Sequence, residues 1–146
     1  MPETGYTIHI EFPSLLEMLD LVQAVVEQLA LILRADEDSQ HWMEVAVRES
    51  VTNAIKHGNH LDASKKVELD FTMTPAEAPT ELHARVRDHG DGFDAAGLPD
   101  PLAPENLLKS SGRGIFFMRS FMDEVRIEAA AGGGTAVYMI KRFTRS

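Results

Sequence analysis

The spacing of apolar residues changes along the chain, and these changes limit the folds that the sequence can adopt. Apolar and polar residues alternate over residues 6–12, 67–73 and 82–86, which is the period of strands with one buried face. Over residues 15–34 and 40–57 apolar residues recur every three or four positions, which predicts two helices. Strands and long helices in one short chain predict an α+β fold.

The last third of the chain continues this pattern after an irregular segment. Residues 89–111 are rich in Gly, Pro, Asp and Ser, and a loop of this length in a compact domain is usually functional. A helix is expected over 115–122, followed by a hairpin of strands near 125–129 and 137–139. We therefore predict a two-layer α/β sandwich, a mixed and mostly antiparallel sheet with helices on one face.

The start of the first helix carries a recognisable capping pattern. Ser14 is followed by Glu17 three residues later, directly before the first helical apolar run. This spacing is typical of a capping box, in which each side chain bonds a free backbone N–H at the helix start. We expect the Ser14 hydroxyl to cap the first helix.

The overall composition limits the class of protein. The chain has 146 residues, of which 44% are hydrophobic, and this fits a single globular domain over residues 1–146. Absence of Cys excludes disulfides, cysteine zinc sites and thiol nucleophiles. A net charge of 14 − 23 = −9 gives no general attraction to nucleic acid or anionic membranes. Neither a membrane-spanning run nor a secretory signal is present, so we expect a soluble, cytoplasmic protein.

Charge is distributed unevenly along the chain. Residues 1–50 contain ten acidic and two basic side chains, whereas residues 109–146 contain seven basic and three acidic ones. A basic C-terminal quarter in an acidic chain is consistent with a site for a small anion. Scattered surface charge explains the same counts.

Two polar residues interrupt the apolar stripe of the second predicted helix. Glu49 and Asn53 stand four positions apart, so their side chains project side by side. A carboxylate beside an amide oxygen suits a hard cation such as Mg²⁺, which takes oxygen ligands. The alternative is that this helix turns outward and that water solvates both side chains.

An acidic residue at the end of the third predicted strand forms a second irregularity. Asp88 shares the parity of the apolar residues before it, so its side chain should point toward the core and needs a hydrogen-bond partner there. Gly90 and Gly92 follow, and they permit either a close approach of backbone to a ligand or a simple turn. An inward carboxylate before a glycine loop could accept a hydrogen bond from a ligand amino group.

A third candidate lies where the last predicted helix begins. Gly112, Arg113 and Gly114 stand at this helix start, where free backbone N–H groups and the helix dipole favour phosphate. Arg113 adds a planar set of donors. A flexible loop that ends in a serine cap explains the same residues.

The order of these pieces resembles the sequence boxes of the GHKL ATPase superfamily, which includes gyrase, heat-shock chaperone, histidine kinase and mismatch-repair ATPases. Chain length and the last helix narrow the resemblance to its small serine-protein kinase/anti-sigma factor branch, and it covers residues 6–143. The matching boxes are Glu49-x-x-x-Asn53-Ala54-x-x-His57-Gly58, Asp88-x-Gly90-x-Gly92-Phe93, Gly112-Arg113-Gly114-Ile115 and Gly133-Gly134-Thr135.

The resemblance implies an ATP site with a role for each box. Asn53 would hold Mg²⁺, Glu49 would be the general base, and His57 would lie near the phosphates. Asp88 would accept a hydrogen bond from the adenine amino group, and Thr135 would assist nearby. The remaining implied contacts are Gly90 and Gly92 on the base, Gly112, Arg113 and Gly114 on the outer phosphates, and an ATP lid over about 94–111.

The resemblance also implies a function. It predicts an ATP-dependent serine/threonine-protein kinase that phosphorylates an anti-anti-sigma antagonist and sequesters a sigma factor. It further implies a homodimer, for which the first strand and first helix are the expected surface, while the acid-rich first third suits a basic partner. Two alternatives stay open: a non-catalytic ATP-binding module, and a detached histidine-kinase catalytic domain.

Overall fold

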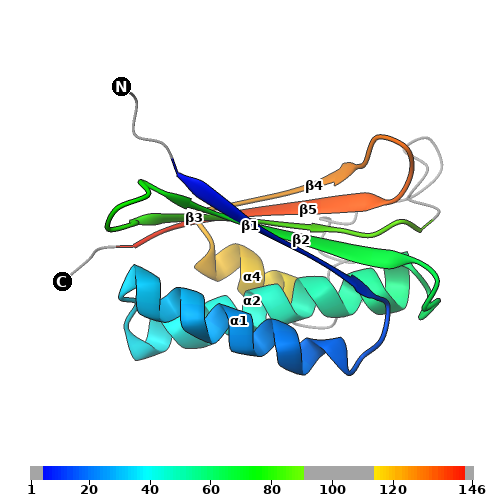
Figure 1. The fold of residues 1–146 in the computed structure, drawn as a ribbon, viewed down its shortest axis with the longest axis horizontal. Coiled ribbons are helices and arrows are strands. Elements are labelled where there is room, and N and C mark those ends of the chain that lie inside the picture. The colour runs from blue at the N-terminus through cyan, green and yellow to red at the C-terminus, as the bar shows by residue number, and fades with distance from the viewer. Residues whose placement is uncertain (1–4, 91–113, 144–146) are drawn as a thin grey trace.

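A five-stranded sheet forms one layer of the molecule (Figure 1). The computed structural model describes residues 5–90 and 114–143 of the chain. Within these ranges all four strand pairings are antiparallel, whereas the sequence analysis allowed for a mixed sheet. The strands are β1 (Tyr6–Pro13), β2 (Lys66–Thr74), β3 (Glu81–Arg87), β4 (Glu124–Ala129) and β5 (Thr135–Arg142), in the spatial order β1-β2-β3-β5-β4.

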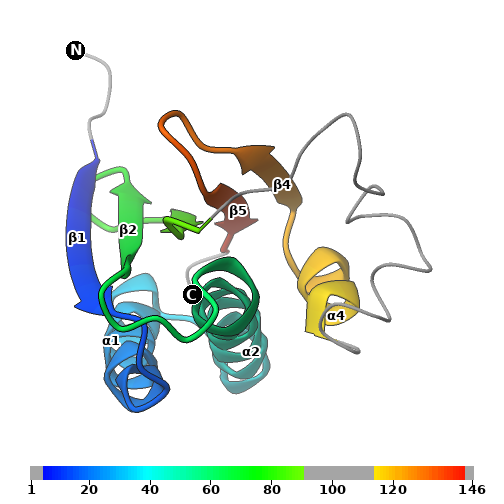
Figure 2. The same cartoon turned by 90° about the vertical axis from the view of Figure 1, so that its right-hand side faces the viewer.

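The helices form a second layer on one face of this sheet, which confirms the predicted α+β architecture (Figures 1 and 2). α2 lies between α1 and α4 and contacts both (Figure 2). In the described part of the chain, no helix has the length and apolar character that crossing a membrane requires. The helices are α1 (Met18–Leu33), α2 (Glu37–Asn53), the short π-helix η1 (Ala54–Gly58) that continues α2, and α4 (Gly114–Phe121).

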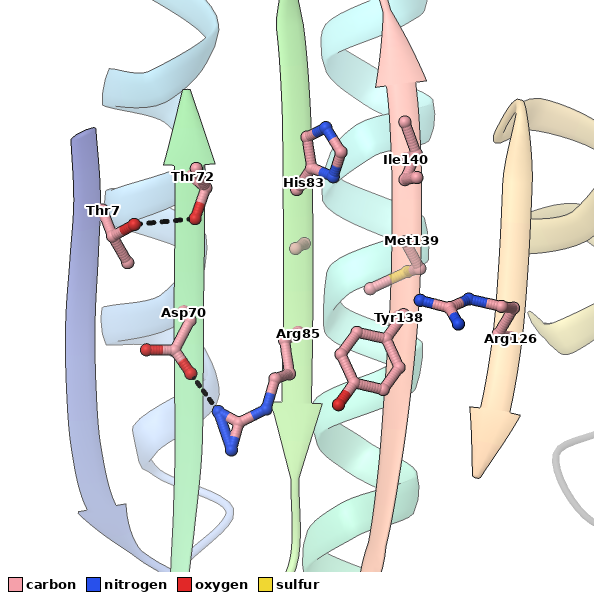
Figure 3. Close-up of a pocket in the computed structure, with 10 residues that line it drawn as sticks. Thr7, Asp70, Thr72, His83, Arg85, Arg126, Tyr138, Met139 and Ile140 are labelled. Carbon is pink, nitrogen blue, oxygen red and sulfur yellow. Dashed lines mark hydrogen bonds and ion pairs between the residues drawn. The ribbon is translucent and has the colours of Figure 1, made fainter. Parts of the chain in front are cut away.

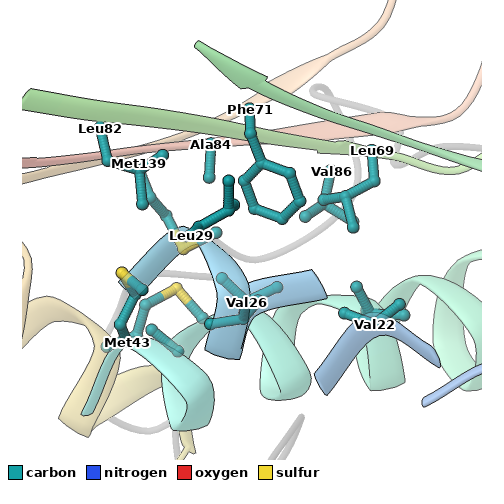
Figure 4. Packing of buried hydrophobic residues seen from close by; sticks show 14 of the residues in the cluster. Val22, Val26, Leu29, Met43, Leu69, Phe71, Leu82, Ala84, Val86 and Met139 are labelled. Atoms are coloured by element: carbon teal, nitrogen blue, oxygen red, sulfur yellow. The ribbon is translucent and has the colours of Figure 1, made fainter. Parts of the chain in front are cut away.

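The core lies between the two layers because alternate strand residues point toward the helices. Along β2, Leu69, Phe71 and Met73 are fully buried. The register places the Phe71 ring beside Ala84 of β3, whose small side chain leaves room for it. Figure 4 shows Leu69, Phe71 and Ala84 on the side of the sheet that faces Val26 and Leu29 of α1. Period-two patterning in the strands and the apolar helix faces together account for this core.

The other face of the sheet carries charged and polar side chains, which explains why the strands alternate instead of being apolar throughout. His9 of β1 contacts Asp70 of β2 at 2.5 Å and Glu11 at 2.9 Å. The hydrogen bond to Glu11, which has the largest effect, and the one to Asp70 raise the pKa of His9 above its ordinary value. Asp70 also pairs with Arg85 of β3, so the polar contacts cross three strands.

The predicted capping box at the first helix is wrong. α1 begins at Met18, its N-cap is Glu17, and no side chain caps it. The Ser14 hydroxyl instead donates to the carbonyl of Lys65 at 2.6 Å and accepts from Asn59 at 2.7 Å. Ser14 is buried, so its hydroxyl bonds to the chain segments that enclose it there, 45 or more residues away.

The second helix begins and ends differently from the expected residues 40–57. It begins at Glu37 because the Asp36 side chain caps it, accepting from the backbone N–H of Ser39 at 2.7 Å. At the other end α2 becomes a π-helix at Ala54, so the same stretch of chain continues in a wider coil to Gly58.

The C-terminal cap of α1 has a left-handed backbone conformation, and its energetic cost can be measured. Arg34 is exposed and left-handed, with φ 55° and ψ 41°, which costs energy for any residue with a Cβ atom. We expect Arg34→Gly to raise the free energy of unfolding by about 0.5–1 kcal/mol, after allowing for the greater entropy of the unfolded chain. Urea unfolding measures this change. The matched control Ala24→Gly, at an exposed position inside α1, should lower stability by about 1 kcal/mol, and a loss in both variants would contradict the assignment.

Candidate functional site

Glu49 and Asn53 lie where α2 leaves the apolar core. The residues of α2 that face the core are buried, whereas Glu49 and Asn53 are half-buried one turn apart beside them. Among the described residues, neither side chain has a hydrogen-bond or ion-pair partner, so both groups are available to a ligand. The structure therefore places the predicted carboxylate and amide side by side, rather than turned fully into solvent.

The environment of Glu49 makes its carboxylate a stronger base than usual. Partial burial raises the pKa of Glu49, and the positive charge of Lys56 lowers it by a smaller amount. A half-buried carboxylate with an elevated pKa and without a partner among the described residues is characteristic of groups that exchange protons.

The π-helix η1 carries the chain from these residues to the end of the sheet. Asn53 precedes Gly58, the last residue of η1, by five residues. Lys56 and His57 are exposed on η1, so His57 is available to a ligand that lies outside the core. π-Helical turns interrupt α-helices mostly at functional positions.

Asp88 follows β3 directly and is buried, as its parity along the strand predicts. Its Oδ1 accepts from the backbone N–H of Gly90 at 3.0 Å and of Thr135 at 3.1 Å. The backbone N–H of Asp88 in turn donates to the Thr135 carbonyl at 3.0 Å. The structure therefore brings together three predicted site residues, Asp88, Gly90 and Thr135, at the junction of β3 and β5.

Three glycines enclose Asp88 so closely that no other residue fits in their place. A Cβ atom on Gly58 would lie 2.2 Å from Asp88 Oδ2, and one on Gly134 would lie 2.1 Å from the Asp88 carbonyl oxygen. A Cβ atom on Gly90 would lie 1.8 Å from the Gly58 carbonyl oxygen. The sequence analysis named Gly58 only as the last residue of the first matching box and gave it no contact, because nothing in the local pattern shows that residue 88 packs against it.

One oxygen of Asp88 stays available. Oδ1 takes both backbone N–H groups, whereas Oδ2 has no donor within the described residues and is not fully enclosed. Burial raises the pKa of Asp88, while the N–H groups of Gly90 and Thr135 and the nearby positive charges of His89 and Arg87 lower it by less. This arrangement fixes the carboxylate and leaves one acceptor for a donor group on a ligand.

Several predicted site residues lie outside the described residues. These are Gly92, Gly112 and Arg113, and the segment 94–111 that the resemblance identifies as an ATP lid. Gly114 is the first residue of α4, which lies beside α2.

A shallow groove of about 380 Å³ lies on the open face of the sheet, and Glu49, Asn53 and Asp88 do not line it (Figure 3). Asp70, Arg85 and Tyr138 line it, and the guanidinium of Arg126 stacks over the Tyr138 ring at 4.9 Å. Its floor is the sheet itself, so it shares no wall with Glu49, Asn53 or Asp88.

The raised pKa of Asp88 predicts how stability depends on pH. The folded protein holds the Asp88 proton more tightly than the unfolded chain does, so its contribution to stability falls as pH rises from about 4 through the raised pKa. Asp88→Asn removes the ionisable group, and with it this decrease in stability at higher pH. We expect the variant to become progressively more stable relative to the parent over this pH range, as measured by urea unfolding.

Asp62→Asn is the matched control for this pH dependence. Ser64 donates to the exposed Asp62 and lowers its pKa, so Asp62 contributes stability that is lost as pH falls. The stability difference between variant and parent should therefore change with pH in the opposite direction. A flat pH profile for Asp88→Asn would show that Asp88 titrates normally.

Comparison with known proteins adds independent evidence. The family model of the histidine kinase-like ATPase domain matches residues 12–141 of this chain. The chain is 34% identical to an anti-sigma F factor of Anoxybacillus flavithermus and 32% identical to one of Geobacillus kaustophilus. Each alignment spans 143 residues and covers 95% of this chain and 94% of the relative.

A solved structure supports the fold. The RsbU and RsbW domains of Rv1364c from Mycobacterium tuberculosis match with a TM-score of 0.63 and 20% identity, over 97% of this chain and 33% of that one. Since the family model spans most of the chain and the relatives align along nearly their full length, this chain belongs to the GHKL-type histidine kinase-like ATPase domain family.

Proposed function

We propose that this protein is an ATP-dependent serine/threonine-protein kinase that also acts as an anti-sigma factor. The observation that carries the proposal is the pair Glu49 and Asn53, two polar groups without protein partners in the described residues, on a helix that leads directly to the enclosed carboxylate of Asp88. Along the chain from α2 to β3, the proposed proton acceptor Glu49 is followed by the proposed metal ligand Asn53. Asp88, the proposed hydrogen-bond acceptor for adenine, comes last.

The adenine end of the site is Asp88. Oδ2 faces no protein donor in the described part of the chain, so the amino group of adenine can donate to it. Because Gly58 and Gly134 have no side chains, their backbone packs closely against Asp88, and two backbone N–H groups hold its Oδ1. A fixed acceptor distinguishes an amino group from a carbonyl oxygen, since the latter would meet it with like partial charge.

The phosphate end of the site is Asn53. The amide oxygen of Asn53 is a suitable ligand for Mg²⁺, which binds few protein oxygens and completes its shell with phosphates and water. When bound, Mg²⁺ neutralises charge on the phosphates during transfer. Exposure of His57 on the following turn allows this side chain to contact the phosphates as well.

Glu49 is the proposed base. It stands one helical turn from Asn53, with a pKa raised by burial, so it can accept the proton of an incoming hydroxyl group. Its position allows it to orient that hydroxyl toward the phosphate held near Asn53. A serine or threonine hydroxyl of an anti-anti-sigma antagonist is the acceptor that we propose.

The relatives and the surface of α1 support a protein partner. Full-length relatives are anti-sigma F factors, so a sigma factor is the second partner that we propose. Four of the five large exposed apolar side chains in the described residues lie on α1 and the turn before it, and acidic residues accompany them, while the fifth, Leu61, follows η1. The apolar residues are Leu16, Leu21, Leu31 and Ile32.

A homodimer is the assembly that we propose for this chain. β1 is an edge strand with one free side, and α1 lies next to it in the helical layer (Figure 2). A second copy could therefore contact both elements at once. Sedimentation at several protein concentrations measures this association.

The first test of the kinase function is Glu49→Gln. Removal of the base should leave ATP affinity within about twofold of the parent and lower phosphoryl transfer by about 10²–10⁴-fold. Transfer of labelled phosphate from ATP to the antagonist measures the rate, and the product should be acid-stable phosphoserine or phosphothreonine. The control Glu44→Gln lies on the same helix, where Glu44 accepts from Gln40, and should retain full activity.

The outcome separates the kinase from its alternatives. ATP binding without any phosphate on the antagonist in the parent protein would indicate a non-catalytic binding module. Acid-labile phosphohistidine would indicate a histidine kinase, and full activity of Glu49→Gln would show that another group is the base.

The second test is Asn53→Ala. Loss of the amide oxygen should abolish the increase in ATP affinity that Mg²⁺ produces, while affinity measured in EDTA stays close to that of the parent. Calorimetric titration with and without Mg²⁺ measures both values. Asn53→Asp keeps an oxygen ligand and should retain the Mg²⁺ effect, whereas an unchanged Mg²⁺ effect in Asn53→Ala would remove Asn53 from the metal site.

A further inference from the structure

Asn59 is a fully buried amide that joins three separate segments of the chain. Its Nδ2 donates to the Ser14 hydroxyl at 2.7 Å and to the Lys66 carbonyl at 3.0 Å. Its Oδ1 accepts from the backbone N–H of His89 at 2.8 Å. The amide therefore links the turn before α1, the start of β2 and the end of β3 from its place directly after η1.

The contact with His89 lies next to Asp88. Gly58 and Asn59 form one side of this contact, and residues 88–90 form the other. The peptide after Asp88 is held by Asn59, while its carboxylate is held by the N–H groups of Gly90 and Thr135. Because Asp88 has so little room beside Gly58, a shift of the His89 peptide would move the carboxylate as well.

We propose that Asn59 is a positioning residue for base recognition: it holds the peptide after Asp88, and thereby the carboxylate, in the orientation that accepts the adenine amino group. This inference rests on the proposed function, in which Asp88 recognises adenine. Asn59 contacts no nucleotide itself in this arrangement, since it is fully buried.

An amide is suited to this position for a simple chemical reason. The site requires two donors toward Ser14 and Lys66 and one acceptor toward His89, all within reach of one short side chain. Asn supplies both donors and an acceptor without charge. An aliphatic side chain would remove the partner of the part-buried His89 N–H, that of the part-buried Lys66 carbonyl and one of the two hydrogen bonds of Ser14. The same bonds could serve stability alone, so the test must separate stability from base selectivity.

The experiment compares Asn59→Ala with Ser14→Ala. Both changes remove part of the same buried network, but Ser14→Ala leaves the bond between Asn59 and His89 intact. The readout is the ratio of the affinities for ATP and ITP, in which a carbonyl oxygen replaces the adenine amino group. This ratio does not depend on the fraction of folded protein, and thermal unfolding of each variant measures stability separately.

We expect both variants to unfold at lower temperature and only Asn59→Ala to lose selectivity. Its ATP-to-ITP ratio should fall about tenfold, the effect of one poorly aligned hydrogen bond to a charged group, while Ser14→Ala keeps the parent ratio. If Asn59→Ala does not fold, Asn59→Ser gives the same readout, because its side chain is too short to reach His89.

Two results would overturn the inference, and they differ in meaning. An unchanged ratio in the Asn59 variant, with selectivity intact in the parent, would assign Asn59 to stability alone and leave the proposed function standing. Equal affinity of the parent for ATP and ITP would show that Asp88 does not recognise adenine, and this inference would fail together with the proposed role of Asp88.

Discussion

The carboxylate of Asp88 is the contact on which the arrangement of the site depends. Two backbone N–H groups from separate parts of the chain bond one of its oxygens, and Gly58 closes against the other. These contacts join the end of β3, the start of β5 and the end of η1 at one point. A helix and two neighbouring strands are thereby held in register around a single charged group.

The same contact has an energetic cost for the isolated protein. Burial raises the pKa of Asp88, so an ionised Asp88 reduces the stability of the folded state at neutral pH. Glu49 shows the same direction of shift on α2. Polar groups kept partly buried and short of partners are typical of sites whose partners arrive with a ligand. The two carboxylates lie at opposite ends of the route from α2 through η1 to β3.

The two faces of the sheet differ in what they contact. The helix-covered face provides the core and supports α2, from which Glu49 and Asn53 project. The open face carries ion pairs such as that between Asp70 and Arg85, and in the described part of the chain the large exposed apolar side chains lie mostly on α1 and the turn before it. Contacts with a proposed sigma factor or second copy are therefore best sought along α1, whereas the proposed antagonist must reach Glu49 at the nucleotide site itself.

Much of the fold could be predicted because its causes are local. Alternation of apolar residues identified all five strands, and the inward parity of Asp88 followed from the same rule. Spacing along α2 put Glu49 and Asn53 side by side. Predictions that involved distant neighbours were less successful: the capping box failed because the Ser14 hydroxyl bonds Lys65 and Asn59 instead of the helix start.

The sequence by itself determined the periodicities, the element order and the residue types that carry chemistry. Only the tertiary structure decided that Gly58, Gly90 and Gly134 meet around Asp88, and that Asn59 ties residue 89 to residues 14 and 66. The physical reason is that strand and helix periods depend on near neighbours, whereas close contacts and buried hydrogen bonds depend on which distant segments share the same space.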